Sequence, residues 1–213
     1  AIYEIRNLYF CANCAIPCIL DRETLEFLFF SQRQINMLRE TITLGAGCFW
    51  CFEAVLKELK GVISVTSGYM GGRTNNPTYK EVCTGSTGHA EVAQVVFDPA
   101  ILSLDQLLEV FWGTHDPTTK DRQGADVGSQ YQSVIFYHTD EQQRTAMAYM
   151  KKLDESGAYA GRLVIEVVPA VEFYAAENYH KDYFALNGEQ GYCQMVIRPK
   201  LDRFRKVFAD RIN

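Results

Sequence analysis

The sequence lacks a marked excess of charge of either sign. Its 213 residues include 21 Lys and Arg and 26 Asp and Glu, which gives a formal net charge of −5 at pH 7. Proteins that bind nucleic acid usually gather Lys and Arg on one face and have a basic pI. This composition gives no sign of such a face, and we therefore expect no nucleic-acid partner.

Long apolar stretches are lacking as well. No apolar run approaches the roughly 18 residues that a membrane-spanning helix needs. The first residues also lack the basic and then apolar layout of a secretory signal. We therefore expect a cytoplasmic protein that makes no contact with a membrane, and we expect it to be a monomer.

Histidine is scarce, and the four histidines have no His partner three or four residues away. A metal site built on histidine is therefore not expected. The composition is otherwise typical of a globular protein, with 47% hydrophobic and 22% charged residues. The length suffices for one substantial hydrophobic core.

Cysteine is present in an odd number, seven. Because disulfide frameworks of small secreted domains use even sets of cysteines, this set does not indicate one. It is more typical of redox-active or metal-binding thiols in a reducing compartment. The cysteines are Cys11, Cys14, Cys18, Cys48, Cys51, Cys83 and Cys193.

Residues 1–40 form an N-terminal extension whose role the sequence does not reveal. Cys11, Cys14 and Cys18 could bind zinc if a fourth ligand came from elsewhere, which would make the extension a metal-binding interaction module. No second Cys or His pair follows at zinc-finger spacing, so the alternative is an extension with incidental cysteines.

One stretch, residues 45–51, combines a glycine-rich turn with two cysteines. Residues 41–44 are short and β-branched, as in a strand, and Gly45 and Gly47 permit a tight turn. The apolar residues that follow recur at the i, i+3, i+4, i+7 spacing of one helix face. Cys48 is therefore expected at a helix N-terminus, where the dipole lowers a thiol pKa and favours the reactive thiolate. We infer that Cys48 is a nucleophile, with Cys51 about one helical turn later.

Hydrophobic periodicity and turn residues predict the other elements. Two capping boxes, at 103–106 and 139–142, mark helix N-termini. Glu53 and Lys57 form an i, i+4 pair on the polar face of the first helix. The pattern predicts an α+β fold: a two-layer mixed sheet with helices packed against it and a ferredoxin-like core. We expect strands over 62–66, 92–97, 131–138 and 163–168, further helices over 104–111, 140–157, 175–186 and 199–208, and loops over 68–79 and 115–130.

A carboxyl group is placed on an apolar strand face. Alternation puts Glu91 on the same side as Ala93, Val95 and Phe97. A buried carboxyl has a raised pKa, because burial disfavours its charged form. Glu91 can then donate a proton near neutral pH. The alternative is a Glu at a strand end whose carboxyl reaches solvent.

Further thiols accompany Cys48. Cys51 completes a Cys-x-x-Cys pair at the helix start, and Cys193 lies in a flexible, glycine-containing tail that is able to swing toward Cys48. A nucleophilic thiol with neighbouring thiols suits an enzyme that passes through a sulfenic acid or a mixed disulfide. Cys83 is expected to be a buried packing residue. A thioredoxin-like disulfide oxidoreductase that uses Cys48-x-x-Cys51 is the alternative.

Several motifs occur in an order and at a spacing that resemble the A-type peptide methionine sulfoxide reductase family over roughly residues 42–208. The extension lies outside this resemblance, which makes residues 41–213 the expected catalytic domain. The motifs are Gly47-Cys48-Phe49-Trp50, Gly68-Tyr69-Met70-Gly71-Gly72, Asn76-Pro77-Thr78-Tyr79, Thr87-Gly88-His89-Ala90-Glu91, Gly128-Ser129-Gln130-Tyr131, Ala176-Glu177-Asn178-Tyr179-His180 and Gly191-Tyr192-Cys193.

The resemblance implies a role for each matching residue. Cys48 matches the nucleophile that attacks the sulfur of methionine S-sulfoxide, and Glu91 matches the acid that protonates the sulfoxide oxygen. Tyr79 and Tyr131 match phenols that hydrogen-bond this oxygen. Asp126 matches a carboxylate near the active site. The resemblance implies no metal and no organic cofactor.

The resemblance also implies how the substrate is held and how the enzyme is recycled. Phe49 and Trp50 match apolar residues that hold the substrate methyl group. Methionine leaves, and the sulfenic acid on Cys48 is resolved by Cys51, by Cys193 or by both before thioredoxin reduces the disulfide. From the thiol positions, we expect Cys51 to act first and Cys193 to form the disulfide that thioredoxin reduces.

Overall fold

The computed structural model describes residues 39–213, and the residues from Arg39 to Asn213 pack as one unit. The extension over 1–40 lies almost entirely outside this range. Cys11, Cys14 and Cys18, and a zinc site or interaction module built on them, are therefore outside the described residues. The domain division at residue 40 likewise stays a prediction from the sequence.

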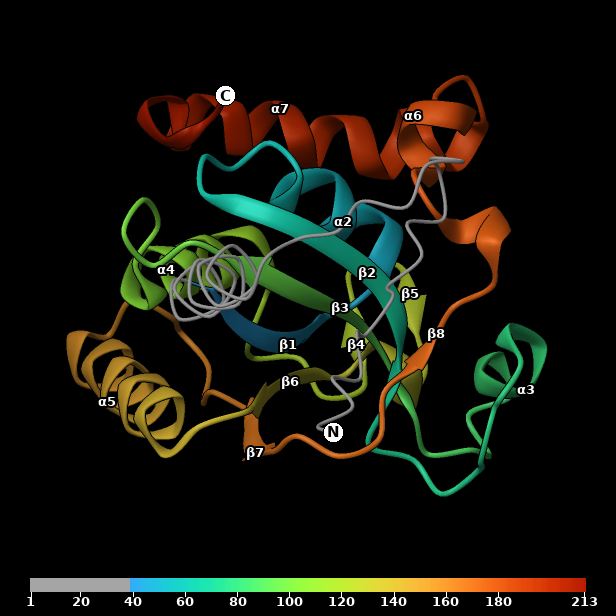
Figure 1. Cartoon of the computed structure of the whole chain (residues 1–213), viewed down its shortest axis with the longest axis horizontal. Helices are drawn as coiled ribbons and strands as arrows, with labels where there is room; N and C mark the ends of the chain where they lie inside the picture. The colour runs from blue at the N-terminus through green and yellow to red at the C-terminus, as the bar shows by residue number, and fades with distance from the viewer. Residues whose placement is uncertain (1–38) are drawn as a thin grey trace, which may run out of the picture. The chain divides into compact units, whose positions relative to one another are not determined.

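A six-stranded sheet runs through the centre of the described domain (Figure 1). Its strands lie in the order β7-β6-β1-β3-β2-β8. Neighbouring strands are antiparallel except for β6 and β7, which are parallel. The strands are β1 (Glu40–Ala46), β2 (Val62–Met70), β3 (Ala90–Phe97), β6 (Ser133–Tyr137), β7 (Glu166–Pro169) and β8 (Tyr174–Ala175).

The four central strands have the ferredoxin-like arrangement that the sequence predicts. The first half consists of β1, α2 (Phe49–Leu56) and β2, and the second of β3, α4 (Leu104–Thr114) and β6. Their spatial order is β6-β1-β3-β2, with every neighbouring pair antiparallel. This is a β-α-β-β-α-β core, and the parallel strand β7 makes the sheet mixed. The expected α+β class is confirmed.

The main hydrophobic core fixes the register of β3. It joins β1 and β3 to side chains of α2, α4, α5 (Asp140–Ser156) and α7 (Arg198–Val207). Ala93, Val95 and Phe97 belong to this core, whereas Ala90 and Val92 belong to a second cluster on the other sheet face. Burying an apolar side chain such as Val or Phe stabilises the fold by about 1.5–3 kcal/mol. A slip of one residue would reverse these faces, so the core also determines where the side chain at position 91 lies.

The two expected capping boxes mark helix N-termini, but only one is reciprocal. At the start of α4, the Ser103 hydroxyl accepts from the Gln106 N–H, and the Gln106 side chain accepts from the Ser103 N–H. At the start of α5, the Thr139 hydroxyl accepts from the Gln142 N–H. The Gln142 side chain instead accepts from the His138 N–H, which ties α5 to the end of β6.

The two expected loops contain regular structure. In the first, β2 extends to Met70, and a capping box formed by Thr78 and Glu81 starts α3 (Tyr79–Cys83). In the second, a short hairpin is formed by β4 (Arg122–Gln123) and β5 (Asp126–Val127). Elements of two to five residues give too little periodicity to be read from a sequence.

Residues 175–186 do not form the single helix that was expected. Strand β8 is followed by a 3₁₀ turn (Asn178–His180) and by α6 (Tyr183–Asn187). Asp182 lies between the last two at φ 55, in the left-handed region, which ends any helix that reaches it. Contacts of this segment with α2 and α3, described below, outweigh its helix propensity.

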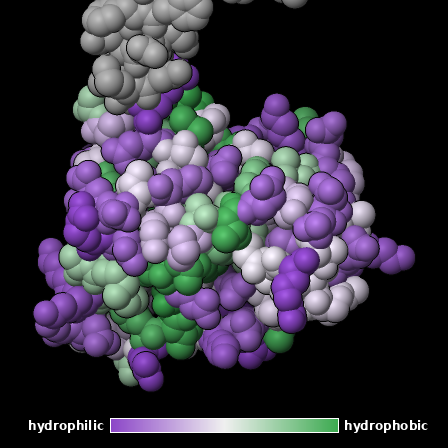
Figure 2. Space-filling model, turned by 60° about the horizontal axis from the view of Figure 1, so that its bottom comes forward, coloured by the Kyte–Doolittle hydropathy of each residue, from purple (hydrophilic) through white to green (hydrophobic). Residues whose placement is uncertain are grey.

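Figure 2 shows a face on which hydrophilic side chains predominate and hydrophobic ones gather in a band between them. Single exposed apolar residues, such as Ile101 and Leu186, are normal on a globular surface. Within residues 39–213, no helix combines the length and the apolar content that crossing a bilayer requires.

Candidate active site

The turn before α2 fixes the position of Cys48. β1 ends at Ala46, Cys48 is the N-cap residue of α2, and Phe49 is the first residue of the helix. Gly47 adopts φ 82, and a Cβ atom added there would lie 2.5 Å from the Cβ of Gln123. Glycine is therefore the residue that fits this turn without strain. The strand, the turn and the helix start lie where the sequence predicts them.

The three cysteines that are predicted to take part in the reaction lie together. Cys48, Cys51 and Cys193 form one buried cluster with Ile197, and all three are free cysteines. Cys193 begins a π-helical turn (Cys193–Ile197) that continues into α7. The expectation of a flexible tail around Cys193 is therefore wrong, because helical hydrogen bonds and apolar packing hold this residue in place.

Burial dominates the acid–base properties of Cys48. The residue is only 5% exposed. Desolvation raises the pKa of the Cys48 thiol, and the hydrogen bond with Cys51 raises it further. That hydrogen bond lowers the pKa of Cys51. The expected lowering of the Cys48 pKa is therefore wrong for the substrate-free site, in which the raised pKa favours the neutral thiol.

The free amide at the start of α2 serves Glu91 rather than Cys48. The Phe49 N–H donates to Glu91 Oε2 at 3.1 Å. Glu91 is 1% exposed, and burial, followed by the field of Cys48, raises its pKa well above the usual range, although the Phe49 bond opposes this rise. Glu91 is thus a buried acid whose raised pKa favours its protonated form, as alternation along β3 predicts, and the solvent-exposed alternative is wrong.

Two tyrosines and an aspartate reach this region from other elements. Tyr79 opens α3, Tyr131 ends a 3₁₀ turn and Asp126 lies in β5. Burial, followed by the field of Glu91, raises the pKa of both phenols, so their hydroxyl groups stay protonated and able to donate. The ring of Tyr79 lies 6.2 Å from that of Phe49, and Tyr131 packs against the thiol cluster.

Phe49 and Trp50 form an aromatic wall together with residues that precede and begin α6. The ring of His180 lies 5.1 Å from that of Phe49, and His180 Nδ1 accepts from Trp50 Nε1 at 2.9 Å. Tyr183 stacks on Trp50 with ring centroids 3.7 Å apart and planes 5° from parallel. Such a wall, with few polar groups, suits an apolar ligand group such as the methyl of a thioether.

Tyr192 and Glu177 are site residues whose roles the sequence did not reveal. The Tyr192 hydroxyl donates to Asp126 Oδ2 at 2.8 Å and lies 3.9 Å from Cys51 Sγ. Glu177 accepts from the Tyr79 N–H at 2.8 Å and so ties α3 to the chain before α6. Both residues stand in motifs visible in the sequence. Their partners lie 66 and 98 residues away, however, and only the fold brings them together.

Two side chains lie where the sequence did not place them. Glu53 is buried rather than on a polar outer face, because α6 and the chain before it cover this side of α2. Cys83 is exposed rather than packed in the core, because it ends the short helix α3 one turn after Tyr79. Periodicity gave the wrong side for Glu53, since it does not reveal what covers a helix. For Cys83, the general tendency of a free cysteine to be buried gave the wrong expectation.

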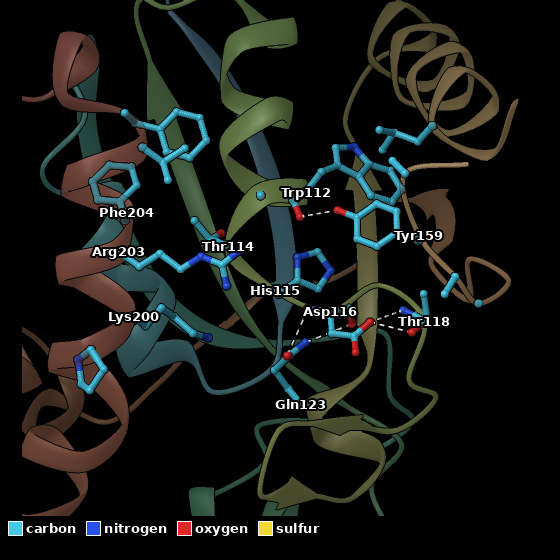
Figure 3. Close-up of a pocket in the computed structure, with 18 residues that line it drawn as sticks. Trp112, Thr114, His115, Asp116, Thr118, Gln123, Tyr159, Lys200, Arg203 and Phe204 are labelled. Atoms are coloured by element: carbon cyan, nitrogen blue, oxygen red, sulfur yellow. Dashed lines mark hydrogen bonds between the residues drawn. The ribbon is translucent and has the colours of Figure 1, made fainter. Parts of the chain in front are cut away.

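A separate cavity of about 860 Å³ lies beside α4 and α7 (Figure 3). Lys200 and Arg203 extend from α7 toward it, and its lining residues include no cysteine. Desolvation lowers the pKa of the buried His115 to about 4, so this ring is neutral. Gln123 belongs to the cavity wall and also packs against Gly47. The cavity therefore borders the turn before Cys48 but holds none of the reactive groups.

Comparisons with known proteins agree with this geometry. The family model for peptide methionine sulfoxide reductase matches residues 40–212. The chain is 52% identical over 173 residues to peptide methionine sulfoxide reductase MsrA of Natronomonas pharaonis. This alignment covers 81% of this chain and 97% of that protein. It is 51% identical over 172 residues to the MsrA of Thermus thermophilus, with the same coverage, 81% and 97%.

Solved structures with the same fold include two further relatives. Mxr1 from Saccharomyces cerevisiae in reduced form is 32% identical and aligns with a TM-score of 0.69 over 74% of this chain and 90% of that one. Methionine sulfoxide reductase A of Corynebacterium diphtheriae is 38% identical and aligns with a TM-score of 0.66 over 74% and 79%. Because a family model spans nearly all of the described domain and relatives exceed 50% identity, this chain belongs to the peptide methionine sulfoxide reductase family.

Proposed function

We propose that this protein reduces methionine S-sulfoxide, free or in proteins, to methionine within a catalytic domain of residues 41–213. The observation that supports this most strongly is the buried pair of a thiol and a carboxyl, Cys48 and Glu91, beside an aromatic wall, with burial raising the pKa of Glu91. A sulfoxide oxygen is a poor leaving group unless it is protonated, so the nucleophile needs an acid close by.

The chemical step transfers oxygen from one sulfur to another. Cys48 Sγ attacks the sulfoxide sulfur while Glu91 gives its proton to the sulfoxide oxygen. The S–O bond of the substrate breaks, an S–O bond to Cys48 forms, and the thiol proton replaces the one that Glu91 gave. The substrate sulfur gains two electrons and the Cys48 sulfur loses two, which leaves methionine and a sulfenic acid. General acid catalysis of this kind contributes roughly 10²–10⁴-fold.

The surrounding side chains hold the substrate. Tyr79 and Tyr131 donate hydrogen bonds to the sulfoxide oxygen, for which their raised phenol pKa keeps them protonated. Phe49 and Trp50 hold the methyl group against the aromatic wall. Asp126 orients the hydroxyl of Tyr192 beside the thiols. These residues supply the groups that the reaction needs without a metal or an organic cofactor.

Recycling uses the other two buried thiols. Cys51 attacks the sulfenic acid, which forms a Cys48–Cys51 disulfide and releases water; the extended ψ of 122° at Cys48 leaves the helical geometry that would otherwise hinder this bond. The position of Cys51 about one helical turn after Cys48, in the same buried cluster, supports its role as the first attacking thiol. Cys193 then exchanges into the disulfide, and the dithiol of thioredoxin reduces it.

The cellular setting rests on the sequence alone. A cytoplasmic location, a monomeric state and the absence of nucleic-acid or membrane partners stay predictions. The net charge of −5 supports the lack of a nucleic-acid partner. Gel filtration of the full chain measures the oligomeric state directly.

The reaction is tested with a racemic methionine sulfoxide substrate and dithiothreitol, following each sulfur epimer by chiral chromatography. We expect loss of the S epimer alone, abolished by Cys48→Ser and strongly slowed by Glu91→Gln. A folded, reduced protein that turns over neither epimer would refute the proposal and favour a thioredoxin-like disulfide oxidoreductase, which insulin reduction would then test. Turnover that survives Cys48→Ser would assign the attack to another thiol.

A further inference from the structure

A network of three charged side chains lies next to Trp50 along α2, and Glu53 is its buried member, whereas Lys57 and Asp182 are partly exposed. Glu53 follows Trp50 by three residues and so lies on the same side of α2. Its side chain is 3% exposed. Glu53 Oε1 accepts from Lys57 Nζ at 2.7 Å and from the backbone N–H of Asp182 at 3.2 Å. Lys57 also pairs with the carboxylate of Asp182. The network thus joins α2 to the residue just before α6.

The pKa shifts of Lys57 and Asp182 both favour the charged forms of these two side chains. Although partial burial disfavours the charge of Lys57, its hydrogen bonds to Asp182 and Glu53 raise its pKa overall. The bond from Lys57 lowers the pKa of Asp182. Hydrogen bonds between charged groups are stronger than those between neutral ones. The contact between Lys57 and Asp182 is therefore charge-assisted.

The residues on either side of Asp182 fix the indole of Trp50. His180 accepts the indole N–H, and Tyr183 stacks on the indole face. Asp182 itself has φ 55, a conformation that a residue other than glycine keeps only where its surroundings hold it. The hydrogen bond from its N–H to Glu53 is such a restraint. Without it, His180 and Tyr183 lose the fixed backbone between them.

We infer that Glu53 is a positioning residue for Trp50, which acts by anchoring Asp182 so that His180 and Tyr183 hold the indole in the substrate wall. The inference rests on the proposed role of Trp50 in holding the substrate methyl group. A wall contacts the substrate equally in the ground state and in the transition state. Loosening it therefore raises KM and leaves kcat unchanged.

The two tryptophans of the chain, Trp50 and Trp112, allow a direct readout. In a Trp112→Phe background, the fluorescence reports Trp50 alone, and its quenching by acrylamide measures how firmly the indole is held. The test compares Glu53→Ala and Glu53→Met with Glu53→Gln, which keeps an oxygen for the Asp182 N–H. The matched control is Glu58→Ala, which breaks another Glu pair of this region, the 2.9 Å bond to Arg205.

We expect Glu53→Ala and Glu53→Met to raise KM roughly tenfold, the effect of losing one charge-assisted hydrogen bond on a binding equilibrium. We expect kcat to stay within about twofold of the parent, as the loss of uniform binding requires, and acrylamide quenching to increase. Glu53→Gln should bring KM and acrylamide quenching most of the way back to the parent values. Glu58→Ala should change neither KM nor quenching.

Unchanged quenching and KM in folded Glu53 variants would overturn the inference, and so would a fall in kcat at constant KM. Failure of both variants to fold, checked by circular dichroism, would overturn it as well, because Glu53 would then support the whole domain. The quenching readout needs no turnover. A parent protein without reductase activity would refute the proposed function and leave the fluorescence to decide the role of Glu53.

Discussion

We expect Glu91 to lower the stability of the folded protein at neutral pH, and we expect its replacement with Gln to remove this effect. Burial raises the pKa of Glu91 in the folded state, whereas an unfolded Glu has a pKa of about 4.3. Above that pH the unfolded chain releases a proton that the folded protein keeps, so stability falls as pH rises toward the folded pKa. One proton of difference changes the free energy of unfolding by about 1.4 kcal/mol per pH unit.

Gln has the shape of Glu, and its oxygen can still accept from the Phe49 N–H, but it does not titrate. The free energy of unfolding of Glu91→Gln minus that of the parent should therefore rise by about 1.4 kcal/mol per pH unit above about pH 5 and level off above the folded pKa. Taking the difference cancels other titrating groups, such as His115. The assay is urea unfolding of both proteins between pH 4 and 8 with dithiothreitol, and exposed Glu172→Gln serves as the control.

A difference that does not change with pH would mean that Glu91 is ionised in the folded protein, and it would remove the proton donor from the mechanism. The same reasoning sets the direction of the activity profile. Since only the protonated carboxyl donates, kcat/KM of the parent should fall as pH rises through the folded pKa of Glu91. A profile that rises over this range would contradict the acid role.

Two further substitutions test the turn and the recycling route. Gly47→Ala places a Cβ at φ 82 and 2.5 Å from the Gln123 side chain. We therefore expect the free energy of unfolding, measured with urea, to fall by about 1–2 kcal/mol or more. A variant as stable as the parent would show that this turn does not require glycine. Cys51→Ser should still reduce one sulfoxide per molecule but should turn over more slowly with thioredoxin. The assay measures the methionine released with and without thioredoxin. Recycling at the parent rate would contradict the proposed order in which the thiols react.

The fold was predictable where its signal is local. Alternation along β3 placed Glu91 on the core face, and the glycine turn placed Cys48 at the start of α2, because strand period and turn chemistry depend on neighbouring residues. The segment 175–186 was not predictable in this way. Its composition favours a helix. However, the hydrogen bond between Asp182 and Glu53 joins residues 129 positions apart, and this contact determines the backbone conformation at Asp182.

The expected lowering of the Cys48 pKa is wrong because the positive end of the α2 dipole acts on Glu91 rather than on Cys48. The start of α2 does favour an anion, and the group that receives its N–H is Glu91. In the substrate-free site, raised pKa values favour the neutral forms of both the Cys48 thiol and the Glu91 carboxyl. A neutral thiol is a weak nucleophile, which limits its reaction with oxidants in the absence of substrate. In the proposed mechanism, Glu91 gives its proton to a sulfoxide. The negative charge then arises where the Phe49 N–H already points, and the proton of Cys48 gains an acceptor. The helix start then stabilises charge that appears only during the reaction, which is where preorganised dipoles accelerate catalysis.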